Sequence, residues 1–251
     1  MSATANRELA AQAAASVRHP LTLTLLTLTF TTGLIDATSY LGLGHVFTAN
    51  MTGNVVLLGF GIAGTPGLPV ISPIVSMVSF LVGAGLGGFL GTKIERLHPV
   101  HLGVALIIEV LLVAAAGAVA AILPIHANRL SGDVIVALLA FAMGVRNATV
   151  RRVAVPDLTT TVLTLTMTGL AADARLVGNS GTGTLRRVAA ISAMLIGAVA
   201  GALLVKSSLT LPLAAAAALA LVTAVGYGRW QRGLQPRPEP ARRDPQPPQP
   251  G

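Results

Sequence analysis

The chain has 251 residues, of which 53% are apolar and only 10% carry a charge, and its mean hydropathy is +0.75. A soluble domain carries about 25% charged residues, so this composition excludes a water-soluble enzyme. The net charge of +8 comes with only 4% aromatic residues, and the basic side chains stand at the ends of apolar runs. That pattern indicates membrane topology rather than nucleic-acid binding.

Apolar runs follow one another through most of the chain, and six of them reach the roughly 20 residues that cross a bilayer. They lack the alternation of barrel strands, so we expect an all-α, polytopic transmembrane helix bundle. A cytoplasmic segment, 1–19, precedes this 20–228 membrane domain, and a proline- and arginine-rich tail, 229–251, is expected to be disordered. The predicted spans are 21–41, 72–92, 102–123, 131–149, 187–206 and 209–227.

Two further apolar segments, 51–64 and 161–172, are too short to cross comfortably and are rich in polar residues and glycine. If both re-enter and leave on one side, the chain has six spans; if both cross, it has eight. Lysine and arginine accumulate in cytoplasmic loops. Six spans place 15 of the 17 basic residues, Arg146 among them, on the side of the N-terminus. The sequence therefore predicts six spans in the cytoplasmic (inner) membrane, with both termini in the cytoplasm.

An internal repeat relates the two halves of the membrane domain, about 20–124 and 130–228. A shift of 111 residues lays 33–38 over 144–149, and a shift of 110 lays Gly83, Gly87 and Gly91 over Ala193, Gly197 and Gly201. Each half holds three spans, an odd number, so the halves are expected to be inverted across the bilayer. Chance matching in a chain rich in Ala, Thr and Gly is the alternative.

The first short segment carries the pattern of a broken helix. Asp36 lies near the end of an apolar helix, and a polar stretch leads to Asn50-Met-Thr52-Gly-Asn54 and a short apolar run. Backbone that is not helical at membrane depth must be buried in protein or line a water-filled cavity. A half-helix beginning near Thr52 directs free N–H groups toward an anionic or carbonyl group. The alternative is that Asn50, Thr52 and Asn54 only cap and satisfy a loop.

The matching part of the second half holds Asn147 and a threonine-rich stretch with Thr161 and Thr164. Two broken segments that meet about a pseudo-twofold axis bring hydroxyl and amide groups to the middle of the membrane. Together with the first half, this predicts a substrate site at the midplane; the alternative is threonine that holds helices together. The predicted site consists of Asp36, Asn50, Thr52, Asn54, Asn147, Thr161 and Thr164.

Two carboxylates inside apolar spans are candidates for proton coupling, because a charge at a helix centre costs at least ~2.5 kcal/mol. They are Asp36, whose repeat mate Asn147 cannot titrate, and Glu109. The alternatives are that Asp36 pairs with a polar group for folding, and that Glu109 reaches the headgroups. For Arg146, snorkelling to the interface competes with an internal role.

Other patterns indicate packing rather than chemistry. Glycines in 83–91 form a small-residue stripe that lets helices approach closely, and no strand precedes them as a dinucleotide fingerprint requires. The five histidines are scattered, cysteine is absent, and no catalytic constellation is recognisable. We therefore expect no enzyme activity, no cofactor and no metal.

The motifs Gly33-x-x-Asp36-Ala, 47–54 (Phe-Thr-Ala-Asn-Met-Thr-Gly-Asn), Gly144-x-x-Asn147-Ala-Thr and 159–164 resemble the YoaK-like family of small bacterial inner-membrane proteins. The resemblance covers about residues 20–228, and the Asn-Met-Thr-Gly-Asn run is its most specific part. It implies about six spans in the cytoplasmic membrane and supplies no substrate.

Two functions remain open at this stage. The first is a small-solute secondary transporter or permease with an inverted three-plus-three repeat, coupled to protons, whose partners are the lipid bilayer and an unknown small solute. The second is a membrane scaffold or accessory subunit without transport, in which the polar stretches serve folding and partner contacts. Nucleic acid is not an expected partner, and a homo-oligomer is compatible with either function.

Overall fold

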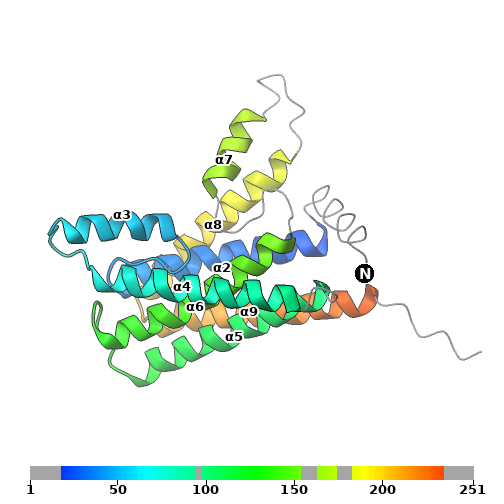
Figure 1. Ribbon diagram of the computed structural model, residues 1–251. Helices are drawn as coiled ribbons and strands as arrows, with labels where there is room; N and C mark the ends of the chain where they lie inside the picture. The colour runs from blue at the N-terminus through cyan, green and yellow to red at the C-terminus, as the bar shows by residue number, and fades with distance from the viewer. Residues whose placement is uncertain (1–17, 94–97, 154–162, 174–182, 235–251) are drawn as a thin grey trace, which may run out of the picture.

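The computed structural model describes residues 18–93, 98–153, 163–173 and 183–234. Residues 1–17 of the predicted segment 1–19, Thr161 and the tail beyond 234 lie outside these residues. Within them the chain forms eight α-helices and no strand (Figure 1). The helices are α2 (Pro20–Gly42), α3 (Met51–Ile62), α4 (Ile71–Lys93), α5 (His98–Ile122), α6 (Leu130–Val153), α7 (Leu163–Ala172), α8 (Thr184–Val205) and α9 (Thr210–Leu234).

Six of these helices are long and apolar enough to cross a membrane, and the other two, α3 and α7, are the predicted short segments. The predicted helical bundle, with six helices of spanning length and two short ones, is thus confirmed. Some boundaries differ: α6 continues to Val153 rather than 149, and α9 continues to Leu234. The tail was therefore predicted to begin too early, at 229. Helix α9 extends because Tyr227 and Trp230 pack together and Trp230 contacts His19 at the start of α2.

Helix α2 is rich in threonine, yet it is regular throughout. The hydroxyls of Thr24, Thr29, Thr32 and Thr38 donate to the carbonyl oxygen four residues earlier at 2.7–2.9 Å. Inside a membrane this bond satisfies a hydroxyl that has no water to contact, so threonine is tolerated in the span. In the α2 span 72% of the residues are buried, against 22% and 17% in α4 and α8. Helix α2 is thus an inner helix, and α4 and α8 lie on the outside.

Glycines bring two pairs of helices into backbone contact. Gly33 of α2 faces Met194 and Ala198 of α8, and Gly197 faces the carbonyl of Phe30. In the same way, α4 packs on α6, where Gly83 faces the carbonyl of Phe141. A methyl group at these glycines would collide with backbone, so the predicted role in packing accounts for them.

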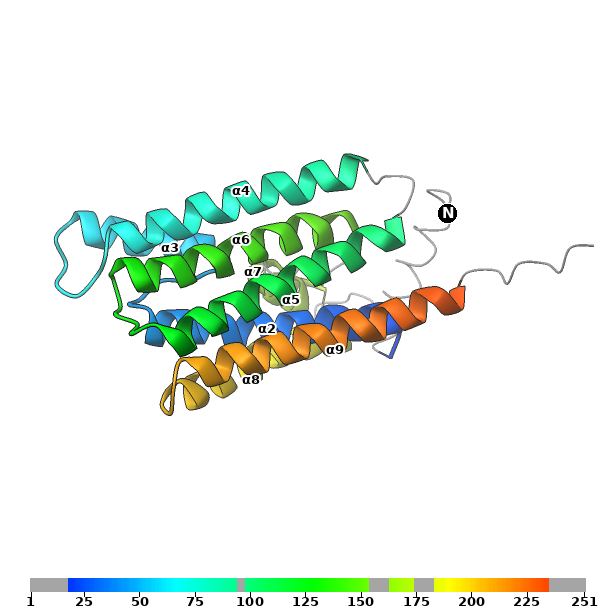
Figure 2. The ribbon, with the colours of Figure 1, turned by 90° about the horizontal axis from the view of Figure 1, so that it is seen from below.

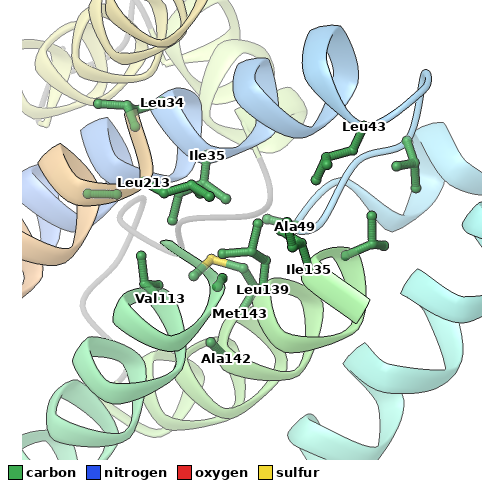
Figure 3. Close-up of a cluster of buried hydrophobic side chains, with 14 residues drawn as sticks. Leu34, Ile35, Leu43, Ala49, Val113, Ile135, Leu139, Ala142, Met143 and Leu213 are labelled. Atoms are coloured by element: carbon green, nitrogen blue, oxygen red, sulfur yellow. The ribbon is translucent and has the colours of Figure 1, made fainter. Parts of the chain in front are cut away.

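Two apolar clusters fill the interior between these pairs. The larger joins α2, the loop after it, α5, α6 and α9, and includes Ile35, Val113, Leu139 and Met143 (Figure 3). The smaller lies around Leu28 and Leu106 and includes Tyr227. Figure 2 shows α5 and α9 side by side along one face, where they close the bundle.

The two short helices occupy different places in the bundle. Helix α3 contacts α4 at the end where α2 finishes and α4 begins, whereas α7 contacts the first turn of α8 and projects from the side of the bundle (Figure 1). The chain thus visits α3 and then starts α4 from the end at which it left α2.

Replacing Gly197 or Gly83 by alanine is expected to lower the free energy of unfolding by about 1–3 kcal/mol, because the new methyl group forces two helices apart. Gly85→Ala is the matched control, since nothing lies within 4 Å of a Cβ there. Thermal unfolding in detergent micelles, followed by circular dichroism, measures the difference. Equal melting temperatures for the three variants would contradict the packing role.

Candidate functional site

The loop between α2 and α3 folds back along α2 and is held there by Asp36. Gly44 and His45 adopt left-handed backbone conformations, with φ of +96° and +60°, and these reverse the chain. The Oδ1 atom of Asp36 then accepts hydrogen bonds from the backbone N–H groups of Thr48 and Ala49, both at 2.9 Å, and from the Thr48 hydroxyl at 3.2 Å. Asp36 precedes the end of α2 by six residues, so the loop returns by ~9 Å along the helix.

The Asn-Met-Thr-Gly-Asn run fixes the start of α3 to this loop. Asn50 caps α3 by accepting from the N–H of Gly53 at 3.1 Å. The fully buried Asn54 clamps the backbone of Phe47, accepting from its N–H at 2.9 Å and donating to its carbonyl at 2.8 Å. Its amide also donates to the hydroxyl of Ser76 on α4 at 3.0 Å. A folding role thus accounts for Asn50 and Asn54, while Thr52 is exposed.

A buried ion pair joins α5 to α6. The guanidinium Nη1 of Arg146 lies 2.8 Å from Oε1 of Glu109, and neither side chain has any exposed surface. The Nη2 atom of Arg146 donates to the hydroxyl of Thr32 on α2. Asp36 is also buried and lies one turn beyond Thr32 on α2. Three ionisable side chains are therefore buried in the bundle interior, on α2, α5 and α6.

Two polar atoms of this pair have no hydrogen-bond partner among the described residues. They are Nε of Arg146 and Oε2 of Glu109, and both are buried. An unpaired polar group in a buried position costs about 1–3 kcal/mol, and more when it is charged. Unpaired buried atoms of this kind are rare in native structures. Binding of a ligand or of a proton at these atoms would give them a partner.

The snorkelling interpretation of Arg146 is wrong. Helix α6 continues for seven residues beyond it, and the exposed arginines 151 and 152 occupy that end instead. Arg146 is thus ~10 Å from the helix terminus, and its guanidinium turns inward to Glu109. The headgroup interpretation of Glu109 fails for the same reason, since this carboxylate is fully buried. Arg146 was missing from the predicted site, although an ionisable residue within an apolar run was the signal that could have found it.

The second-half residues of the predicted site are not gathered with those of the first. Asn147 is partly buried beside Arg146 on α6, and Thr164 is exposed on α7, which projects from the side of the bundle away from α3. What holds α7 is Arg187 of α8, which donates to the carbonyl of Gly169 at 2.6 Å and to Asp173 at 2.7 Å. The seven-residue site and its role in binding stay a prediction. Among the described residues no group of three or more potential metal ligands occurs.

Asp36→Ala is expected to destabilise the protein by about 2–5 kcal/mol, because two buried backbone N–H groups lose their acceptor. Asp36→Asn keeps an oxygen at the same place and should cost much less. Thermal unfolding in micelles compares the two variants with the wild type. Equal losses for both variants would mean that the charge of Asp36, rather than its acceptor oxygen, supports the loop.

Comparison with known proteins agrees with this architecture. A family described as "Protein of unknown function (DUF1275)" matches residues 24–226, which is nearly the whole membrane domain. The UPF0700 transmembrane protein YoaK of Bacillus subtilis (strain 168) is 33% identical over 164 residues, covering 64% of this chain and 68% of that protein. No solved structure matches. The predicted YoaK-like resemblance is confirmed.

Proposed function

The chain belongs to the DUF1275 family of transmembrane proteins, and we propose that it is a small-solute secondary transporter of the cytoplasmic membrane, coupled to protons and built from two inverted halves. The observation that carries the proposal is the fully buried Glu109–Arg146 pair, which connects the first half to the second. Intramembrane charges that pair with each other mark ion and substrate pathways in transporters.

Contacts between the halves support the repeat. If α2 corresponds to α6 and α4 to α8, then the pair α2–α8 corresponds to α6–α4, and these are the two closest helix pairs. The glycines agree: Gly33 faces Met194 of α8 as Gly144 faces Phe80 of α4.

The offset that relates α4 to α8 in this repeat differs from the 110 residues that the sequence predicts. Gly83 faces the carbonyl of Phe141, and Gly197 faces that of Phe30, so Gly83 corresponds to Gly197. The shift is then 114 residues rather than 110, one helical turn more. The sequence alone does not distinguish shifts of 110 and 114 residues, because small residues recur every turn along both helices.

Burial also follows the repeat. The inner helices α2 and α6 have 72% and 61% of their spans buried, the outer helices α4 and α8 have 22% and 17%, and α5 and α9 have 33% each. The chain order also suits two equivalent halves, because α3 stands between α2 and α4 as α7 stands between α6 and α8. Inverted halves can exchange conformations, and that exchange opens a central site to one side and then the other.

A scaffold or accessory subunit remains the second candidate, and one observation favours it. The polar atoms described for Asp36 and Asn54 hold the α2–α3 loop and its neighbour α4, so their presence needs no solute. In that case the protein would carry no flux. We propose no catalytic role for either candidate, and both keep the termini in the cytoplasm.

Single cysteines at Thr65, Ala127 and Pro99 test the topology, since the native chain has no cysteine. We expect a membrane-impermeant maleimide to label positions 65 and 127 in intact cells, but not 99. Position 207 serves as a positive control because it faces outward with six or with eight spans. Labelling of 99 in place of 65 and 127 would mean eight spans, and the inverted repeat would be lost.

Proton flux in proteoliposomes with an entrapped pH dye tests transport. We expect at least one solute of a panel of carboxylates, amino acids, sugars and amines to change the internal pH. Combining Asp36→Asn with Glu109→Gln should abolish this change while the protein still inserts, because no titratable carboxylate remains among the described residues of the bundle interior. Absence of any solute-driven flux in the wild type would favour the scaffold, and unchanged flux in the double variant would defeat the coupling.

A further inference from the structure

We propose that Arg146 binds the carboxylate group of the transported solute, and that protonation of Glu109 releases Arg146 to do so. This inference rests on the proposed transport function and names the chemical class of its substrate. It makes Glu109, rather than Asp36, the proton carrier.

One edge of the Arg146 guanidinium is only partly used for hydrogen bonds. Glu109 holds Arg146 through a single bond, between Nη1 and Oε1 at 2.8 Å, rather than through the two parallel bonds that this pair often forms. The other edge consists of Nη2, which donates to the hydroxyl of Thr32, and of Nε, which has no partner among the described residues. A carboxylate accepts from two such parallel N–H groups, and the neutral Thr32 hydroxyl is the partner that it would replace at Nη2.

Glu109 is arranged to lose its hold on Arg146 when it gains a proton. Its Oε2 atom is buried and has no partner among the described residues, so a proton can be added there without breaking an existing hydrogen bond. A neutral Glu109 attracts the guanidinium less strongly, and the charge of Arg146 then requires another anion. Asp36 suits this task less, because its Oδ1 already accepts three hydrogen bonds from the loop.

The charged groups around Glu109 are few. On α6, Glu109 contacts Arg146. On α2, the buried carboxylate is that of Asp36. Within the described chain, α4 and α9 carry ionisable residues only toward one end, at Lys93 in α4 and at Tyr227, Arg229 and Arg232 in α9. Among the charged groups of the described residues, Arg146 is therefore the one that contacts Glu109 directly.

Charge balance favours an anion that arrives together with a proton. The empty site holds Asp36, Glu109 and Arg146, with a formal charge of −1 when all three are ionised. One proton on Glu109 and one bound monocarboxylate give −1 again, whereas the anion alone would give −2. Each additional charge buried in a membrane protein is costly. The two therefore load together, one proton per carboxylate, and the cycle moves no net charge.

Binding of sodium L-lactate, pyruvate and benzoate to the purified full-length protein tests the inference. We expect each bound carboxylate to raise the melting temperature in detergent, with an apparent affinity that increases as the pH falls, by up to about tenfold per pH unit, which is the limit for uptake of one proton. Lactamide, which has the shape of lactate without its charge, should give no shift. If none of the three carboxylates binds, the inference is overturned.

Variants separate the two roles. Glu109→Gln resembles the protonated state, so its carboxylate affinity should be high and independent of pH. Replacing both residues, Glu109→Gln with Arg146→Gln, keeps a neutral hydrogen-bonding pair that avoids an unpaired buried charge, and should remove binding. Arg151→Gln, on the exposed end of α6, is the matched control and should behave as the wild type. Carboxylate binding that survives in the double-glutamine variant, or that keeps its pH dependence in Glu109→Gln, would overturn the inference.

These binding measurements fail independently of the transport assay. Flux of a sugar or an amine without carboxylate binding would support the transport function and contradict the proposed role of Arg146. Carboxylate binding without any flux would support the Arg146 site and contradict the transport function.

Discussion

The bilayer offers no hydrogen-bond partners, and this constraint accounts for most of the structure. Every backbone group that leaves a helix at membrane depth must find a partner inside the protein. Asp36 and Asn54 supply those partners for the loop between α2 and α3, where one carboxylate oxygen accepts from two consecutive N–H groups and one amide pairs with both polar groups of Phe47. The threonine hydroxyls of α2 are satisfied inside the protein as well, because they donate to backbone carbonyl oxygens one turn earlier in the helix.

Helix association in lipid depends on close contact rather than on a hydrophobic driving force. Gly33 and Gly197 provide that contact between α2 and α8, and Gly83 and Gly144 between α4 and α6. Two glycine contacts of this kind thus hold the four helices in pairs, while α5 and α9 pack against each other.

The pair of Glu109 and Arg146 departs from what packing alone would require. A buried ion pair rarely adds stability over an apolar pair of the same size, because both charges lose their hydration. This pair also leaves Nε and Oε2 unsatisfied among the described residues, so stability is a poor explanation for it. Function is a better one, and the proposed exchange of Glu109 for a solute carboxylate gives both atoms a use.

The sequence by itself determined the class of protein, the six spans and the two short helices, because hydropathy and length act locally and the bilayer sets their scale. It also indicated which residues matter near α3, since the Asn-Met-Thr-Gly-Asn run is a local motif. Only the tertiary structure decided that Arg146 turns inward rather than toward the headgroups, because that depends on Glu109 and Thr32, which lie 37 and 114 residues away. It likewise decided that Gly83 faces the backbone of Phe141 and Gly197 that of Phe30, because a contact between backbones of different helices leaves no trace in the spacing along either one.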